Sequence, residues 1–255
     1  MDSPHILNVS RVIGSTLVWF LLRNAIPVVS YILFPAYKQF SVKDKTNWAN
    51  HFVSLLHAVL AATLSTMAFA TAPELFYDMV DAQNPYCEAL LAMSTGYFIY
   101  DTMDMWSSGL YRNDVGIWTH HGVVIACFSS AIMVGKFSAY LAATLIVEWS
   151  GVFLHIRKLS LIANISPRST FYSILAKLNV YAFILLRIVP TFALNAKVLL
   201  DRSTFPSMIS WAIAASGMTL MSIYNVIFWG QIRKAEKRVM QNHSTNGKMG
   251  NKSEK

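Results

Sequence analysis

Seven runs of mainly apolar residues occupy most of this chain and constrain its fold. They lie near residues 12–34, 49–71, 87–108, 116–135, 137–160, 172–199 and 207–230. Each has about the 20 residues that an α-helix needs to cross the hydrocarbon core of a bilayer. Hydrophobic residues make up 55% of the chain and charged residues 13%, too few for a water-soluble surface. The sequence therefore predicts an all-α, polytopic membrane protein with about seven transmembrane helices.

The charged residues of the loops predict how these helices are oriented. Basic residues gather in the first, third and fifth loops and after the last run, whereas the second loop is acidic. Since cytoplasmic loops are enriched in lysine and arginine, we expect an outside N terminus and a cytoplasmic C terminus. We divide the chain into an N-terminal helix and first loop at 1–44, a six-helix domain at 45–230, and a basic cytoplasmic tail at 231–255, which we expect to be disordered.

The net charge does not indicate a nucleic-acid partner, and the cysteines do not indicate a disulfide framework or a zinc site. The net charge is +8, but the basic residues flank hydrophobic runs, where they orient helices and meet lipid headgroups, so we predict no nucleic-acid partner. Cys87 and Cys127 provide neither a disulfide framework nor the paired spacing of a zinc site. His51 and His57 fit hydrogen-bonded packing better than metal ligation, because no ligand set surrounds them in the sequence.

Ionisable residues inside the predicted spans are the candidate functional residues. They are Asp101, Asp104, His120, His121, Glu148 and Arg187. A charge in hydrocarbon is expensive, so such residues face protein or water and usually mark a site. At 1.5 Å per residue, the carboxylates and histidines nearest the cytoplasm lie about 8 to 15 Å inside the membrane, and Arg187 lies about 20 Å inside. We therefore expect one polar pocket that opens toward the cytoplasm, beside a kink at Pro190.

Helical spacing limits which of these side chains can meet. Asp101 and Asp104 share one stripe of the third predicted helix with Tyr97, so this stripe must face protein or water. Arg187 needs a partner at its depth, and Glu148 or Asp101 can supply it. A purely structural pair of Asp101 with Arg187 is the alternative to a functional site.

The two adjacent histidines lie about a turn inside the cytoplasmic end of the fourth predicted helix. His120 and His121 point about 100° apart, so only one of them can face a shared centre squarely. Glu148 and His155 share one side of the fifth predicted helix. Zinc or iron would suit such ligands, but the one-face histidine spacing of a helical zinc motif is absent, so we predict no metal.

Several segments resemble the TLC-domain superfamily, which includes the ceramide synthases, over about residues 45–230. The segments are Trp48, Asn50, Val53, Ser54 and His57; GYFIYDTMDMW from Gly96 to Trp106; the pair His120 and His121; LIVEWSGVFLHIR from Leu145 to Arg157; and LLRIVP from Leu185 to Pro190. The last two are most similar to the non-synthase branch called TLC domain-containing proteins one and two. The resemblance implies a barrel of six helices, the second to the seventh, around a lipid-accessible cavity, with the first helix alongside.

The resemblance also implies two functions. Ceramide synthases are thought to transfer an acyl group from coenzyme A to a sphingoid amine with a histidine pair and two following aspartates. Here Glu148 stands at the place of the first aspartate and Gly151 at the second, so the synthase signature is incomplete. The non-synthase branch is associated with limiting polyunsaturated chains in membrane phospholipids, which preserves fluidity at the plasma membrane.

We therefore expect a lipid-homeostasis protein of the plasma membrane, or alternatively of the endoplasmic reticulum, whose partners are membrane phospholipids or fatty acyl chains. The expected lipid-binding residues are Asp101, Asp104, His155 and Arg187. The alternative is an acyltransferase that takes acyl-CoA as substrate, with His120 or His121 as base or nucleophile and Glu148 as orienter. We expect no resident cofactor in either case. A transporter is a third class, which no inverted-repeat pair of broken helices supports.

Overall fold

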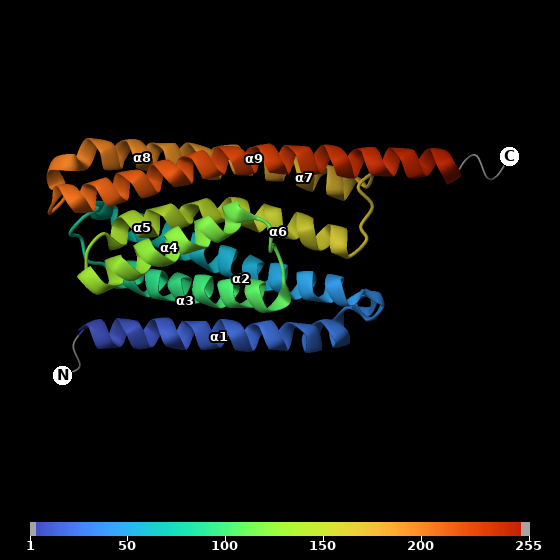
Figure 1. The fold of residues 1–255 in the computed structure, drawn as a ribbon, viewed down its shortest axis with the longest axis horizontal. Helices are drawn as coiled ribbons and strands as arrows, with labels where there is room; N and C mark the ends of the chain where they lie inside the picture. The colour runs from blue at the N-terminus through green and yellow to red at the C-terminus, as the bar shows by residue number, and fades with distance from the viewer. Residues whose placement is uncertain (1–3, 251–255) are drawn as a thin grey trace.

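Long helices run back and forth between the two ends of the molecule (Figure 1). This computed structural model describes residues 4–250, and side chains for residues 9–239. The α-helices are α1 (Pro4–Leu33), α2 (Val42–Thr71), α3 (Pro85–Ser108), α4 (Val115–Val134), α5 (Ser138–Thr144), α6 (Glu148–Ile162), α7 (Thr170–Phe183), α8 (Val189–Leu200) and α9 (Met208–Gly250). The short turns are η1 (Pro35–Gln39), η2 (Pro73–Phe76), η3 (Leu145–Val147), η4 (Ile184–Ile188) and η5 (Asp201–Thr204).

The helices begin and end at residues whose side chains or backbone conformations suit helix termini. Side-chain oxygens accept hydrogen bonds from the first free backbone N–H groups of four helices, and the residues that supply them are Ser41, Asn84, Asp114 and Ser169. Gly109 and Gly135 follow α3 and α4 with φ of 70° and 69°, a left-handed conformation that glycine adopts without strain. These signals divide the apolar sequence into separate spans.

The predicted all-α membrane fold is confirmed. Within the part of the chain that the structure describes, six stretches are long and apolar enough to cross a membrane, since η3 joins α5 to α6 and η4 joins α7 to α8. The 24-residue α3 is the seventh span and is less apolar, because it carries Asp101 and Asp104. The start of α1 and the end of α9 lie at opposite ends of the molecule, as an odd number of spans requires (Figure 1).

Six of the spans form a closed ring, which confirms the predicted barrel. Contacts follow the order α2, α3, α4, α9, α8 with α7, α6 with α5, and back to α2. Helix α1 lies outside this ring against α3 and α2 (Figure 1). Each ring helix therefore presents one side to the interior of the barrel and another to lipid.

Helix α1 approaches α3 closely at a glycine. A Cβ atom at position 96 would lie 2.6 Å from the Cβ of Ser15 and 2.8 Å from the backbone nitrogen of Thr16. The Ser15 hydroxyl donates to the Met93 carbonyl at 2.8 Å. Small residues that let two backbones approach are a usual device for packing helices in membranes.

The last helix continues well past the end that the sequence predicts. Our prediction of disorder from residue 231 is wrong for the stretch up to Gly250, because α9 extends through it (Figure 1). Glu236 forms an ion pair of 3.0 Å with Arg157, which is buried, and Ile232 is buried as well. These contacts hold the first turns to the barrel, which composition alone does not reveal. The part of the predicted tail after Gly250 lies outside the described residues.

Candidate functional site

Two irregular turns meet inside the barrel and position two charged residues. Pro190 has no backbone N–H and cannot bond the carbonyl four residues earlier, and the preceding segment widens into the π-turn η4, which contains Arg187. The tight turn η3 lies across from it and ends just before Glu148. Turns of this kind inside long helices occur frequently at functional sites.

Arg187 forms the centre of this part of the site. Its Nε donates to the Ser150 hydroxyl at 2.6 Å, and its Nη2 donates to Glu148 Oε1 at 3.3 Å and to the Val147 carbonyl at 3.4 Å. Of the two partners that the sequence allows for Arg187, the structure shows Glu148, and the alternative pair with Asp101 is wrong. Ser150 was not predicted as a partner, because residues two apart on a helix do not face each other and the position of Glu148 gave no signal for it.

Gly151 makes room for the Glu148 carboxylate. A Cβ atom at position 151 would lie 2.8 Å from Glu148 Oε2 and 3.4 Å from the Cβ of Ala58. The first distance is shorter than real Cβ contacts, so a larger residue would displace the carboxylate. Glycine at 151 and glutamate at 148 are therefore sterically coupled in this chain.

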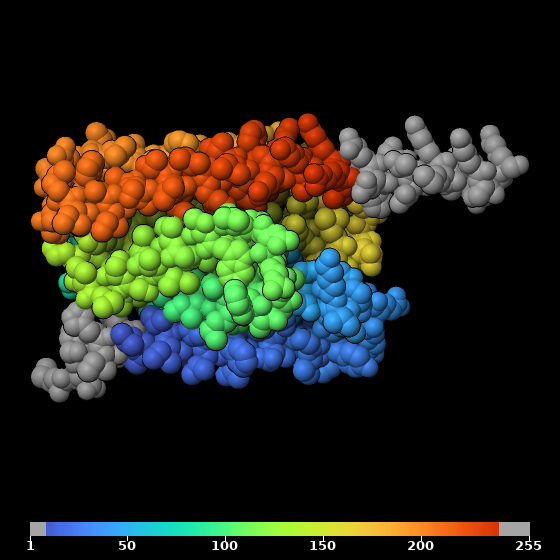
Figure 2. All heavy atoms as spheres, viewed as in Figure 1, coloured from blue at the N-terminus to red at the C-terminus, as the bar shows by residue number. Residues whose placement is uncertain are grey.

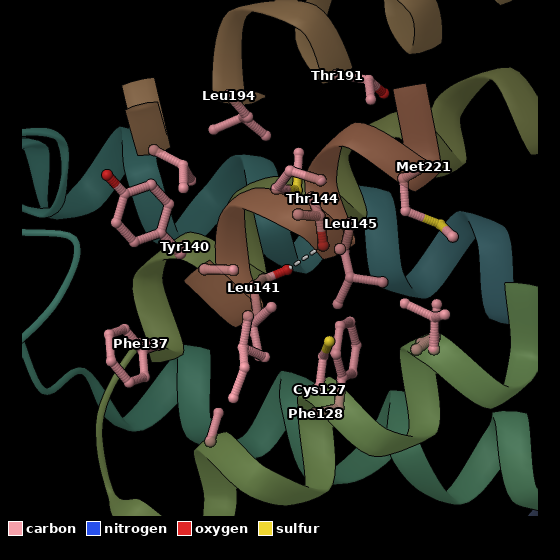
Figure 3. Close-up of a pocket in the computed structure, with 18 of the residues that line it drawn as sticks. Cys127, Phe128, Phe137, Tyr140, Leu141, Thr144, Leu145, Thr191, Leu194 and Met221 are labelled. Atoms are coloured by element: carbon pink, nitrogen blue, oxygen red, sulfur yellow. Dashed lines mark hydrogen bonds between the residues drawn. The ribbon is translucent and has the colours of Figure 1, made fainter. Parts of the chain in front are cut away.

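A cavity of about 300 Å³ extends from this ion pair through the barrel. Figure 3 shows side chains from α4, α5, α8 and α9 converging on it, most of them apolar, among them Phe128, Leu141, Leu194 and Met221. The two charged lining residues, Glu148 and Arg187, pair with each other at one end. The uncharged polar lining residues are His120, Ser130, Tyr140, Thr144, Thr191, Ser210 and Asn225. The cavity is thus an apolar chamber with a polar end.

Part of the cavity wall is made by residues that are exposed on the outside of the barrel. Helices α4 and α9 lie side by side on one face of the molecule (Figure 2). Each contributes an exposed residue to the cavity wall, since Val134 and Ile213 are both 60% exposed. At the end away from the ion pair, Phe137 stacks on Phe205 with ring centres 5.4 Å apart. The described lining therefore reaches the outer surface at α4 and α9, and the mouth toward the cytoplasm stays a prediction.

The two adjacent histidines face different surroundings. His120 lines the cavity, stacks on the Tyr224 ring with centres 5.4 Å apart, and places Nδ1 3.3 Å from the sulfur of Met221. His121 is buried against α3, with Nε2 3.6 Å from Asp101 Oδ2. The histidine with a carboxylate partner is therefore not the histidine that lines the cavity.

A second polar cluster lies between α1, α2 and α3. The Asn50 amide donates to Asp101 Oδ1 at 2.8 Å and to Asp104 Oδ2 at 3.2 Å. Arg23 of α1 lies 3.2 Å from Asp104 Oδ1. The predicted stripe of α3 thus faces protein, as its spacing requires, but neither aspartate is among the described residues that line the cavity. The sequence analysis did not identify Arg23 or Asn50 as partners.

His155 belongs to a third cluster. Its Nδ1 lies 3.4 Å from Nδ1 of His51, and His51 Nε2 lies 3.3 Å from the Tyr111 hydroxyl. His155 does not belong to the described cavity lining either. Within the described residues, no three His, Cys, Asp or Glu side chains come together as a metal site. The structure therefore brings Glu148, Arg187 and His120 to the cavity and separates them from the other candidates.

Comparison with known proteins gives consistent matches. The model of the TLC domain family matches residues 47–234. The chain is 27% identical over 194 residues to TLC domain-containing protein 2 of Danio rerio, which covers 76% of this chain and 78% of the relative. It is 30% identical to TLC domain-containing protein 2 of Mus musculus, covering 51% and 42% of the two chains. It is 32% identical to TLC domain-containing protein 1 of Gallus gallus, covering 56% of each chain.

Proposed function

Because this chain belongs to the TLC domain family, we propose that it regulates the acyl composition of membrane phospholipids by binding an acyl lipid in its intramembrane cavity. In this proposal it limits the incorporation of polyunsaturated chains and so preserves fluidity. It acts in the plasma membrane, with its C terminus in the cytoplasm. The lipid is held with its polar group near Glu148 and Arg187.

The observation that carries this proposal is the cavity between α4, α5, α8 and α9. Its wall is mostly apolar, its two charged residues pair with each other, and its wall includes exposed residues of α4 and α9. Its volume of about 300 Å³ is at the lower end of the range of about 300 to 1,000 Å³ for small-molecule pockets. These features suit one acyl chain with an attached polar group better than both chains of a phospholipid.

Filling the cavity tests the proposal. A Cβ atom at Gly217 would lie 3.8 Å from the sulfur of Cys127, so Gly217→Leu extends a side chain across the cavity from α9. Ser216 is the neighbouring residue of the same helix and is exposed, so Ser216→Leu is the matched control. In cells that lack the native protein, the wild type and Ser216→Leu should restore the phospholipid acyl profile, and Gly217→Leu should not. Equal restoration by all three at equal protein level would refute the proposal.

An acyl-CoA-dependent acyltransferase is the second candidate, because His120 lines the cavity. A histidine nucleophile or base normally has a third group that orients it. Among the described residues, His120 contacts Met221 and Tyr224, whereas the Asp101 carboxylate lies beside His121. This separation favours binding over acyl transfer. Purified protein supplied with labelled acyl-CoA and lysophospholipid or amine acceptors should form no product. Product that disappears in His120→Ala would instead establish the enzyme.

A further inference from the structure

The cavity lining carries no net charge. Among the described residues that line it, Glu148 and Arg187 are the charged ones, and they are opposite in sign and paired at 3.3 Å. The rest of the lining is uncharged, apart from the titratable ring of His120. A ligand that brings a full charge into this chamber therefore finds no unpaired opposite charge.

The ion pair nevertheless keeps hydrogen-bonding capacity for a ligand. Arg187 uses Nε and Nη2 for its protein partners, and no described residue accepts a hydrogen bond from Nη1. Glu148 accepts through Oε1, and no described residue donates to Oε2. Both side chains line the cavity. The pair thus keeps one donor group and one acceptor atom that no described residue uses.

The cost of burying charge distinguishes between classes of acyl lipid. A fatty acid carboxylate would give the lined chamber a net charge of about −1, and a sphingoid ammonium would give about +1; an uncompensated buried charge is costly. An uncharged group with one acceptor and one donor instead satisfies the free Nη1 and Oε2 atoms. Such pairing avoids the penalty of leaving buried polar groups without partners.

We propose that the ligand is a single-chain glycerol ester, which enters the polar end through its uncharged ester and hydroxyl groups. The ester carbonyl accepts from Arg187 Nη1, and the glycerol hydroxyl donates to Glu148 Oε2. Monoacylglycerols and lysophospholipids share this chemistry. The proposal rests on the proposed function above, and it names the substrate class of the same cavity.

Photolabelling with lipids of equal chain length tests this ligand class. The full chain in phosphatidylcholine nanodiscs is exposed to diazirine-bearing monoacylglycerol, lysophosphatidylcholine, alkyl sulfonate or quaternary alkylammonium, and labelled cavity peptides are quantified by mass spectrometry. One or both glycerol esters should label the cavity at least about tenfold more than either charged probe. The reason is that the charged probes cannot supply both the acceptor for Arg187 and the donor for Glu148, and an unmade hydrogen bond to a charged group costs at least that much. The ratio between the two glycerol esters shows whether a phosphate group is tolerated outside the polar end.

Charge variants make the test independent of any general loss of fold. Glu148→Gln leaves Arg187 unneutralised, so labelling should shift toward the sulfonate, and Arg187→Gln should shift it toward the ammonium. The double variant Glu148→Gln/Arg187→Gln is again uncharged and should return to the ester preference, which a merely damaged protein would not do. Thermal unfolding of each variant in the nanodisc confirms which proteins are folded.

The outcomes separate the two proposals. Preference of the wild type for a charged probe overturns the ligand class, while the cavity remains a lipid site. A folded double variant that is still labelled preferentially by a charged probe also overturns the ligand class. Absence of labelling by every probe in the folded wild type refutes the proposed function itself.

Discussion

At the scale of single residues, the coupling of Gly151 to Glu148 is the most specific feature of the site. Alanine at position 151 places a Cβ atom 2.8 Å from Glu148 Oε2. We expect Gly151→Ala to lower the free energy of unfolding by about 1 kcal/mol, at the low end of overpacking costs, because the atom it meets is the far end of a flexible side chain that can shift. Chemical denaturation of the purified protein measures this difference.

Two further variants control for the general effect of replacing glycine in a helix. At Gly122 of α4, a Cβ atom would meet nothing within 4 Å, so Gly122→Ala should not destabilise the protein. In a Glu148→Ala background the clashing carboxylate is absent, so adding Gly151→Ala there should cost less than it costs in the wild type. If Gly151→Ala is as stable as Gly122→Ala, the carboxylate is not held where the structure places it.

The sequence identified the ionisable residues inside the spans, but it did not show which of them share the cavity. The angle between His120 and His121 indicated that only one could face a shared centre, and His120 alone of the two lines the cavity. Which one does so depends on how α4 packs against α3 and α9, and helical periodicity does not contain that information. The position of Arg23 opposite Asp104 likewise depends on where α1 docks.

At the scale of elements, the π-turn η4 is what directs Arg187 inward. Pro190→Ala restores a backbone N–H, so the π-turn can become regular α-helix. Each residue by which the register shifts rotates the preceding segment, with Arg187, by about 100° around the helix axis. We expect this variant to be as stable as the wild type or more so, but to lose the effect on phospholipid acyl composition. Lipid mass spectrometry of cells that express it measures this effect.

Pro27 provides the control for this change. It lies inside α1, outside the barrel, so Pro27→Ala should keep the wild-type acyl profile. A Pro190→Ala protein with full activity would show that the π-turn is not needed to orient Arg187.

Helix α1 is held to the barrel by a charge pair as well as by close packing. Arg23 and Asp104 are partly buried and 3.2 Å apart, so either single replacement leaves one charge without its partner. A double-mutant cycle with Arg23→Gln and Asp104→Asn should give a coupling of about 1 to 3 kcal/mol in unfolding free energy. Additive effects of the two replacements would mean that the pair does not fasten α1.

At the scale of the whole molecule, apolar runs and their spacing were sufficient to predict seven spans and, with the family resemblance, the barrel. The continuation of α9 was not predictable, because the stretch after Gly230 reads as polar and charged. Its first turns are held to the barrel by a tertiary ion pair between Glu236 and Arg157, which are far apart in the sequence.

The positions of the termini give a prediction at this scale. Since α1 starts and α9 ends at opposite ends of the molecule (Figure 1), tags at the two termini should be accessible from opposite sides of the membrane. The loop charges predict a cytoplasmic C terminus. A glycosylation acceptor should be modified at the N terminus and not at the C terminus. Modification at both ends would contradict the seven-span fold, and modification at the C terminus alone would reverse the orientation.

The central claim is that the barrel encloses a chamber for one acyl lipid, with its polar group at Arg187 and Glu148. An experimental structure of the full chain in lipid nanodiscs tests it most directly. We expect continuous density for a single acyl chain between α4, α8 and α9, ending beside the ion pair. A chamber filled by protein side chains, or left without lipid density while lipids are resolved around the outer surface, would contradict the claim.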